Sequence, residues 1–269
     1  MRSIAITNQK GGSGKTTTAV NLAAALGESK RRVLVVDLDP QASASAWLGV
    51  KDAKRELLDV LLDGQPLAGA VRATTAPNVD VAPSSAWLVG AEKALAGEVG
   101  AETLLRARLA ELPADRWDYV LLDCPPSLGL LTVNALSAVR EVLVTVEAHV
   151  MALAGVAQLM QTVRVVQERL NPELRVGGIL ACRVDVRTRH SREVVEHLRQ
   201  GFGDLVYKTV IRENVRLAEC PSFALPILAY DRRTTGTWDY QGLASEIVKQ
   251  EGGEAWHLER RSATTRSTP

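Results

Sequence analysis

The feature that most constrains the fold is a glycine-rich loop between a β-rich run and an Ala-rich helical pattern. The run is residues 3–7, the loop at residues 10–17 reads KGGSGKTT, and the helical pattern covers residues 16–26. Glycines let the backbone turn its N–H groups inward, and the positive end of the following helix dipole adds to their field. The loop therefore predicts an anion cradle sized for di- and triphosphates.

The loop departs from the strict G-x-x-x-x-G-K-[ST] pattern in two ways. Gln9 stands at the first glycine, and a second lysine, Lys10, opens the loop. In this pattern Lys15 would reach the β- and γ-phosphates, and the hydroxyl of Thr16 would bind Mg²⁺. The alternative is a plain glycine-rich turn with a solvated lysine, which the strand–loop–helix context disfavours.

Two further apolar runs end in carboxylates. Residues 33–41 read VLVVDLDPQ and residues 119–127 read YVLLDCPPS. Ligands of open parallel sheets bind at the carboxyl ends of strands, so Asp37, Asp39 and Asp123 are expected to converge on the loop. There they would hold metal-bound water or orient an attacking water. Taken one at a time, each Asp would be equally consistent with a turn cap.

The rest of the chain alternates between strand and helix patterns, as a doubly wound α/β domain with a mostly parallel sheet does. With 46% hydrophobic but only 4% aromatic residues, its core is built from Val, Leu, Ile and Ala. We expect one domain over residues 1–250, followed by a polar, flexible tail over 251–269. Further strands are predicted at 79–82, 142–146, 176–180 and 206–211, and further helices at 91–110, 152–170, 191–198 and 240–248.

Composition excludes several classes of protein. Cys124, Cys182 and Cys220 have no C-x-x-C spacing, which argues against a zinc site or a disulfide framework. No apolar run approaches the ~20 residues of a membrane span, and the first residues do not fit a signal peptide. We therefore expect a soluble, intracellular protein. The formal net charge of +1 excludes a generally polycationic DNA coat.

These motifs resemble the ParA/MinD class of deviant Walker A ATPases, and most closely the Soj-like ParA partition proteins. The resemblance covers about residues 2–250 and is carried by KGGSGKTT at 10–17, VVDLDPQ at 35–41, LLDCPPS at 121–127, SREVVEHL at 191–198 and NVRLAECPSF at 214–223. It implies a P-loop fold, ATP and Mg²⁺ as ligands, and a homodimer in the ATP state. It also implies slow hydrolysis that is stimulated by DNA and by a ParB-like activator protein.

The resemblance also implies roles for single residues. Lys10 matches the signature lysine, which reaches the partner subunit's phosphates, and Asp39 matches the residue needed for hydrolysis; with Lys15 they form the catalytic set. Thr16, Asp37 and Asp123 match the Mg²⁺ site. The nucleotide would be held by Lys10, Gly11, Gly12, Ser13, Gly14, Lys15, Thr16 and Thr17, with Asn214 near the adenine.

Two positions depart from the family pattern. Family members often carry a hydrophobic residue at Ser13. The loop that commonly reads I-P-R-N-V is here Ile211–Val215, without the proline.

A basic segment runs from Arg183 to Arg216, with eight basic and five acidic residues. Its excess of positive charge suits phosphate contacts that do not read bases, but composition alone favours a solvated charged surface. The resemblance implies nonspecific binding of double-stranded DNA through Arg187 and Arg216, with Arg189 and Arg192 as nearby candidates.

The leading interpretation is a cytoplasmic, nucleoid-associated ATPase that partitions chromosome or plasmid DNA. One alternative is a MinD-like ATPase on a membrane surface, but residues 256–261 are too short and too sparsely apolar for the amphipathic helix it needs. A ParA-like ATPase that positions a protein cargo is another alternative. A reductase resembling nitrogenase iron protein would need cysteines paired across the dimer, and a non-enzymatic binding module would leave three carboxylates unused.

Overall fold

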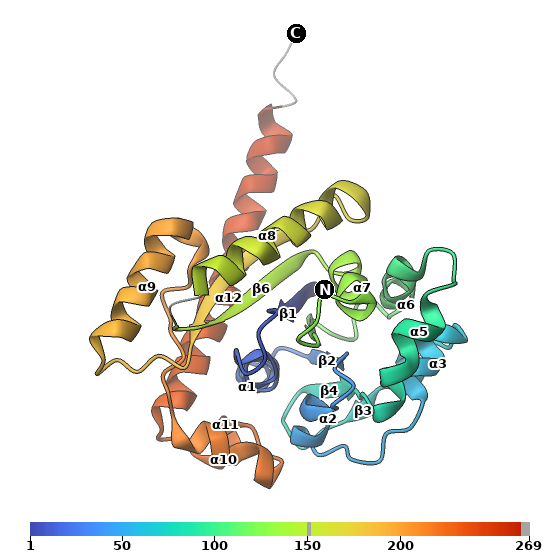
Figure 1. Cartoon of the computed structure of the whole chain (residues 1–269), viewed down its shortest axis with the longest axis horizontal. Helices are drawn as coiled ribbons and strands as arrows, with labels where there is room; N and C mark the ends of the chain where they lie inside the picture. The colour runs from blue at the N-terminus through green and yellow to red at the C-terminus, as the bar shows by residue number, and fades with distance from the viewer. Residues whose placement is uncertain (150–151, 265–269) are drawn as a thin grey trace.

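The computed structural model describes residues 1–149 and 152–264. Over these residues the chain forms one seven-stranded sheet in the order β3-β4-β2-β5-β1-β6-β7 (Figure 1). All strands are parallel except β3, which pairs antiparallel with β4. The predicted doubly wound α/β class is thus confirmed. The strands are β1 (Arg2–Thr7), β2 (Val33–Asp37), β3 (Arg72–Ala73), β4 (Val79–Ala82), β5 (Tyr119–Asp123), β6 (Glu141–Glu147) and β7 (Arg175–Cys182).

Helices cover both faces of this sheet. The α-helices are α1 (Lys15–Glu28), α2 (Ser43–Trp47), α3 (Glu56–Leu62), α4 (Leu67–Ala70), α5 (Ala91–Leu95), α6 (Leu104–Ala110), α7 (Leu130–Ala138), α8 (Ala152–Arg169), α9 (Arg189–Phe202), α10 (Val215–Phe223), α11 (Ile227–Tyr230) and α12 (Thr235–Thr264). Short 3₁₀ segments lie at Ala86–Gly90, Ala101–Thr103 and Gly203–Leu205. None of the described helices is both long and apolar enough to cross a membrane.

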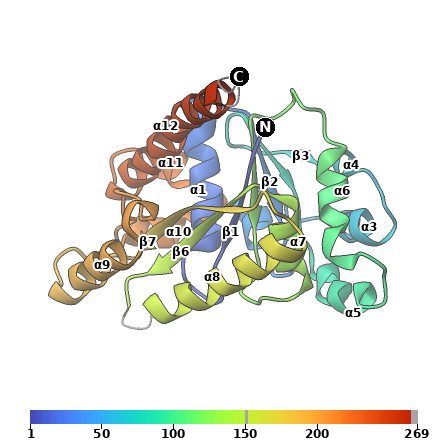
Figure 2. The same cartoon turned by 90° about the horizontal axis from the view of Figure 1, so that it is seen from above.

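The period-two alternation of strand side chains divides the apolar residues between two cores. Ile4 and Ile6 of β1 pack with helices α1, α2, α10, α11 and α12, whereas Ala5 faces helices α3 and α5–α9. Figure 2 shows α1, α11 and α12 together on one side of the strands and α3 and α6 on the other. Burial on both faces explains why the strands read as continuous apolar runs.

The strand order brings three chain segments to one sheet edge. β5 lies between β2 and β1, with Asp37 opposite Asp123 and Ile6 opposite Asp123 in the register. Beyond the strands, the Leu38 N–H donates to the Asp123 carbonyl at 2.9 Å. The loop after β1 and the segments after β2 and β5 are thereby fixed beside one another.

The prediction of a strand at Val206–Ile211 is wrong. Its first residue makes an isolated bridge to Ile179 of β7, but no continuous ladder follows. The N–H groups of Lys208 and Thr209 donate instead to the Glu246 carboxylate of α12, at 2.9 and 2.7 Å. The N–H groups of Tyr207 and Ile211 still donate to carbonyls of β7, at 2.9 and 2.8 Å, but a side chain from a distant helix takes the donors between them and interrupts the ladder.

The helix predicted at 91–110 is broken. It divides into α5 and α6, and between them Gly100 has a left-handed φ of 74°. The last predicted helix, 240–248, belongs to α12, which continues to Thr264. The predicted tail of residues 251–269 is therefore helical up to Thr264, and residues 265–269 lie outside the described residues.

Candidate functional site

The loop after β1 wraps closely because two of its glycines adopt a left-handed backbone. Gly12 has a φ of 74° and Gly14 a φ of 89°. A Cβ atom added at Gly14 would lie 3.3 Å from both Cβ and Sγ of Cys182 in β7, so a side chain there would be strained and crowded. The glycine lets the first turn of α1 sit directly against β7.

Hydrogen bonds to β6 hold this loop in place. The Lys10 N–H donates to Oδ1 of Asn8 at 3.0 Å, and Nδ2 of Asn8 donates to the Thr145 carbonyl at 2.5 Å. The Ser13 hydroxyl lies 3.3 Å from the Thr145 hydroxyl, and both residues are fully buried. Ser13 therefore ties the loop to the sheet through a bond that a hydrophobic residue cannot make.

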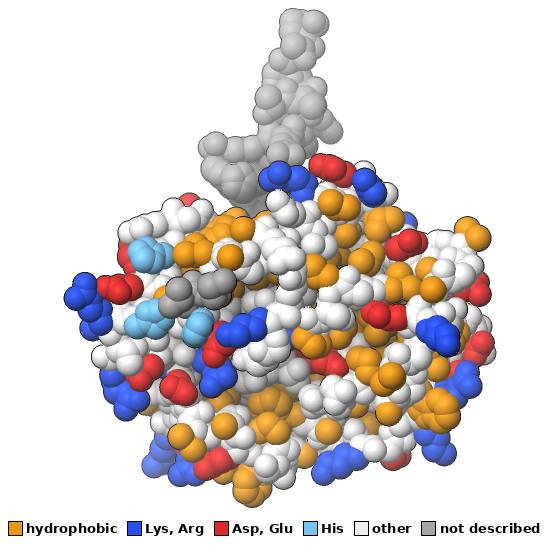
Figure 3. All heavy atoms as spheres, in the orientation of Figure 1, with side chains coloured by type: hydrophobic (Ala, Val, Ile, Leu, Met, Phe, Trp, Pro, Cys, Tyr) orange, Lys and Arg blue, Asp and Glu red, His pale blue; other side chains and the backbone are white. Residues whose placement is uncertain are grey.

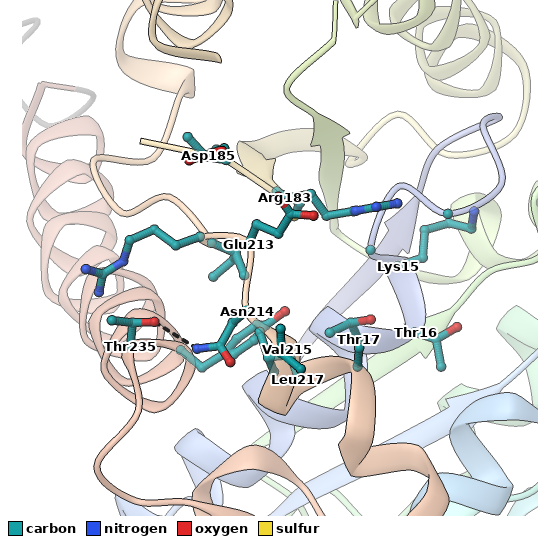
Figure 4. Close-up of a pocket in the computed structure, with 18 of the residues that line it drawn as sticks. Lys15, Thr16, Thr17, Arg183, Asp185, Glu213, Asn214, Val215, Leu217 and Thr235 are labelled. Atoms are coloured by element: carbon teal, nitrogen blue, oxygen red, sulfur yellow. Dashed lines mark hydrogen bonds between the residues drawn. The ribbon is translucent and has the colours of Figure 1, made fainter. Parts of the chain in front are cut away.

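Lys15 places a nearly buried ammonium in the loop. Its side chain folds back so that Nζ donates to the Lys10 carbonyl at 3.1 Å, and the residue is 6% exposed. Burial lowers the pKa of Lys15, while the carboxylates of Asp123 and Asp39 oppose that shift. Figure 4 shows Lys15, Thr16 and Thr17 together at the start of α1, on one wall of a cavity. The predicted phosphate-binding residues Lys15, Thr16 and Thr17 are thus brought together.

Asp37 is held by the turn that follows it. Its carboxylate is fully buried and accepts hydrogen bonds from the Ser45 N–H at 2.8 Å, the Ser45 hydroxyl at 2.7 Å and the Asp39 N–H at 3.2 Å. Burial raises the pKa of Asp37 to about 6 despite these bonds. Asp37 therefore fixes the backbone that presents Asp39.

Asp123 differs from Asp37 because neither of its carboxylate oxygens has a hydrogen-bond partner among the described residues, although both are buried. Burial raises the pKa of Asp123 well above its ordinary value, and the nearby Asp37 carboxylate raises it further, while the neighbouring Thr16 side chain, which lies close but outside hydrogen-bond geometry, opposes the shift. An unpartnered buried carboxylate costs free energy that a hydrated cation would recover.

A magnesium ion fits Asp123. Mg²⁺ usually keeps several waters and takes only one or two carboxylates, with phosphate oxygens completing its shell. The described residues contain no cluster of three or more His, Cys, Asp or Glu side chains able to hold a metal. One carboxylate beside a phosphate loop, such as Asp123, is enough as a protein ligand for a Mg²⁺ ion that is also bound by nucleotide phosphates and water.

A cavity of about 990 Å³ extends from the loop to the segment before α10. Gly11, Gly12 and Gly14 of the loop and Asp39 are among the residues that line it. The opposite side is formed by Asn214, Val215, Leu217 and Thr235, as Figure 4 shows. Its volume lies at the upper end of the range for small-molecule sites. The cavity therefore has a polar end at the phosphate loop and a partly apolar end at the segment before α10.

The predicted base-binding residue, Asn214, is engaged in local structure. Its Nδ2 donates to the hydroxyls of Thr234 and Thr235, at 2.6 and 2.8 Å, and its Oδ1 accepts from the Arg216 N–H at 2.8 Å. Asn214 therefore caps α10 and joins it to the start of α12. A contact between Asn214 and the adenine stays a prediction.

Sequence reasoning missed two charged residues at the cavity end of the sheet, Glu147 and Arg183. Nζ of Lys10 lies 2.5 Å from Oε2 of Glu147, and Nη1 of Arg183 lies 3.4 Å from its Oε1. Lys10 holds the pKa of Glu147 below its ordinary value. Both residues follow strands that were predicted at 142–146 and 176–180, so the rule that found the three Asp residues would have found them too.

The four arginines predicted to bind DNA lie near the β7 edge, on the loop after β7 and on α9 and α10. Asp185 binds Arg187 through two bonds of 2.9 Å, and Glu193 lies 2.6 Å from Arg189. Glu219 lies 2.9 Å from Arg216.

In Figure 3 blue and red side chains alternate along this flank. Arg192 has no ion pair within the described part of the chain. The other three arginines are each paired with a carboxylate, so most of the positive charge of the flank is neutralised.

Comparison with known proteins gives a consistent picture. Residues 1–176 match a family model described as "AAA domain". The chain is 46% identical over 247 residues to the sporulation initiation inhibitor protein Soj of Bacillus subtilis, covering 91% of this chain and 97% of that protein. It is 42% identical to the chromosome partitioning protein ParA of Myxococcus xanthus, over 93% of this chain and 89% of that protein.

Solved structures share the fold over nearly the whole chain. A structure named cobyrinic acid a,c-diamide synthase, from Mycobacterium smegmatis with bound ADP and magnesium, is 33% identical with a TM-score of 0.80, covering 94% of this chain and 96% of that one. The septum site-determining protein MinD of Pyrococcus horikoshii, complexed with Mg-ADP, is 27% identical with a TM-score of 0.76, covering 93% and 97%.

Proposed function

Because the chain belongs to the AAA-domain family, and within it to the Soj and ParA partition ATPases, we propose that it uses ATP and Mg²⁺ to drive DNA partition. The observation that carries the proposal is Asp123, a buried carboxylate without hydrogen-bond partners at the edge of the sheet that holds the phosphate loop. The relatives named for chromosome partition and the structures with bound ADP and magnesium support the same conclusion.

The residues proposed to carry out hydrolysis all lie at the phosphate end of the cavity. The loop amides and Lys15 would bind the phosphates, and the Thr16 hydroxyl and Asp123 would hold a magnesium ion, which would supply positive charge to offset the charge on the phosphates. Asp39 lines the cavity and orients the attacking water. Asp37 keeps Asp39 in place, since its carboxylate accepts the Asp39 N–H.

Dimerisation depends on Lys10, which would leave Glu147 to contact the phosphates of the nucleotide in a second copy of the chain. The Lys10 side chain is 55% exposed, so this exchange needs no unfolding. With a non-hydrolysable ATP analogue, size-exclusion chromatography should give a dimer for the wild type and a monomer for Lys10→Ala. Lys51→Ala, an exposed lysine outside the loop, should dimerise normally. A normal dimer of Lys10→Ala would refute the contact between subunits.

DNA binding follows from dimerisation. Two copies of Arg187 and Arg216 on one continuous face would double the phosphate contacts without any new residue, and Arg189 and Arg192 would extend that face. Each neutralised phosphate releases condensed counterions, so binding should weaken steeply with salt and show little sequence preference. A ParB-like activator and DNA would accelerate hydrolysis, which releases the dimer from the nucleoid.

Co-sedimentation with ATP tests the proposal against the alternative of a membrane-surface ATPase. The protein should sediment with long double-stranded DNA and not with liposomes of anionic lipids, and the DNA-bound fraction should fall when ADP replaces ATP. Binding to liposomes without binding to DNA would favour the MinD-like alternative.

A further inference from the structure

Arg183 lies at the point where the sheet meets the phosphate end of the cavity. It is the first residue after β7 and it lines the cavity. Figure 4 shows its side chain extending from that strand end across the cavity toward the loop, with the guanidinium on the same side as Lys15. A third cation thus approaches the phosphate loop, in addition to Lys10 and Lys15.

The backbone of Arg183 adopts a left-handed conformation at the strand end from which its side chain extends. Its φ is 52°, a left-handed value that is uncommon for residues other than glycine. Of the described non-glycine residues with positive φ, only Arg183 lines the cavity. The next residue is fixed because the Val184 N–H donates to the Ile211 carbonyl at 3.0 Å. Strained backbone that the surroundings hold in place is typical of functional sites.

The guanidinium of Arg183 could form a stronger interaction than its present ion pair with Glu147. Its Nη1 lies 4.0 Å from the position where a Cβ of Gly12 would stand, directly over the loop. Its ion pair with Glu147 is loose at 3.4 Å, and Glu147 is shared with Lys10. A phosphate group accepts two parallel hydrogen bonds from a guanidinium, which makes it a stronger partner than a shared carboxylate.

We propose that Arg183 binds the terminal phosphates of the nucleotide held by its own subunit. The proposal rests on the proposed use of ATP and adds a residue to that site, because the arginine adds a contact opposite the loop amides. Since the guanidinium lies on the same side as Lys15, and the lysine of such a loop reaches the β- and γ-phosphates, the contact should concern these phosphates and not the α-phosphate.

The test compares the affinities of ATP, ADP and AMP, each with Mg²⁺ and without DNA, for the wild type and Arg183→Gln. A lost charge-assisted hydrogen bond at a half-exposed site should weaken ATP binding about tenfold. ADP should be weakened less, and AMP should be unchanged. Arg183→Lys should recover part of the loss, because it keeps the charge. Arg164→Gln, an exposed arginine on α8, should match the wild type.

Three results would overturn the proposal. Equal weakening of all three nucleotides, AMP included, would mean that Arg183 only supports the shape of the cavity. Unchanged ATP affinity in Arg183→Gln, with or without weaker DNA binding, would mean that the arginine does not touch the phosphates. If the wild type itself failed to bind ATP, the proposed function would fail, and the Arg183 proposal would fail with it.

Discussion

The phosphate end of the cavity and the arginine flank are both charged, but the protein holds their charges in different ways. At the cavity, Asp37, Asp123 and Ser13 are fully buried, and the loop is tied to β6 by hydrogen bonds. On the flank, Arg187 and Arg189 have side chains more than four-fifths exposed, and each pairs with a carboxylate close to it in sequence.

The fold holds the charged side chains of the cavity in fixed positions, whereas the exposed arginines of the flank can exchange one partner for another. A buried carboxylate without a hydrogen-bond partner, such as Asp123, has an energetic cost that a bound cation removes, so the cavity favours a ligand that carries one. Exposed ion pairs contribute about 0–1 kcal/mol and exchange partners easily. Substitution at the cavity should therefore cause large losses, whereas breaking an ion pair on the flank without reversing an arginine's charge should cause only a small change.

The largest effect is expected at Asp39. Asp39→Ala should lower the rate of ATP hydrolysis about 1000-fold, as loss of a residue that positions or activates water does. ATP affinity should stay near the wild-type value, because the loop, Lys15 and Asp123 are untouched. Phosphate release under saturating ATP measures the rate, with Asp63→Ala as an exposed control. Wild-type turnover in Asp39→Ala would remove Asp39 from the mechanism.

A smaller but still large effect is expected for ATP binding in Lys15→Ala. Removal of the buried ammonium should weaken ATP about 100-fold, equal to about 2.7 kcal/mol. Lys249→Ala, an exposed lysine of α12 beside the residues that follow α1, should bind ATP normally. Equilibrium titration with a fluorescent ATP analogue provides the measurement, and an unchanged dissociation constant for Lys15→Ala would contradict the geometry of the loop.

Asp123→Asn should make the protein more stable and inactive. The pKa of Asp123 is raised in the folded state, so the folded protein binds more protons than the unfolded chain above pH 4, and stability falls as pH rises through that interval. The same sign applies to Asp37, whose pKa is about 6. Without Mg²⁺ and nucleotide, Asp123→Asn should gain about 2 kcal/mol at pH 7, because a buried charge is removed.

Denaturant unfolding at pH 5 and pH 7 measures this gain, which should be smaller at pH 5. Asp37→Asn is the matched comparison. Asp37→Asn should gain nothing, because in either orientation its amide NH₂ would face a donor, the N–H of Asp39 or the donors of Ser45. A loss of stability in Asp123→Asn would mean that the carboxylate has a partner in the folded chain.

The two regions also differ in how far they could be predicted from the sequence. The loop, Asp37, Asp39 and Asp123 follow apolar strand patterns, and a parallel sheet brings strand ends together, so their convergence could be predicted. The strand at 206–211 could not be excluded from the sequence, because Glu246 takes its donors from another part of the chain.

Side-chain pairing escaped prediction for a similar reason. The pair formed by Lys10 and Glu147 links residues 137 positions apart, and the hydrogen bonds of Asn214 depend on α12. Charge counting gave the excess of positive residues between Arg183 and Arg216, but it did not show that Asp185, Glu193 and Glu219 already neutralise three of them.

The smallest effect is expected on the flank. Asp185→Asn should release Arg187 from its two hydrogen bonds and raise DNA affinity about threefold, in line with the worth of an exposed ion pair. ATP affinity should not change. Fluorescence anisotropy with a labelled duplex in the ATP state measures the gain, and Asp204→Asn serves as the control. Weaker DNA binding by Asp185→Asn would show that Asp185 positions Arg187 for DNA.

The most direct test of the account is DNA binding with ATP and with ADP, on two unrelated duplexes over a salt series, for wild type, Arg187→Glu, Arg216→Glu and the control Arg164→Glu. The account predicts tight, salt-sensitive binding of both duplexes by wild type and control with ATP only. Each flank variant should lose that binding while it still dimerises with ATP. Equal binding with ATP and ADP, or undiminished binding by both flank variants, would contradict it.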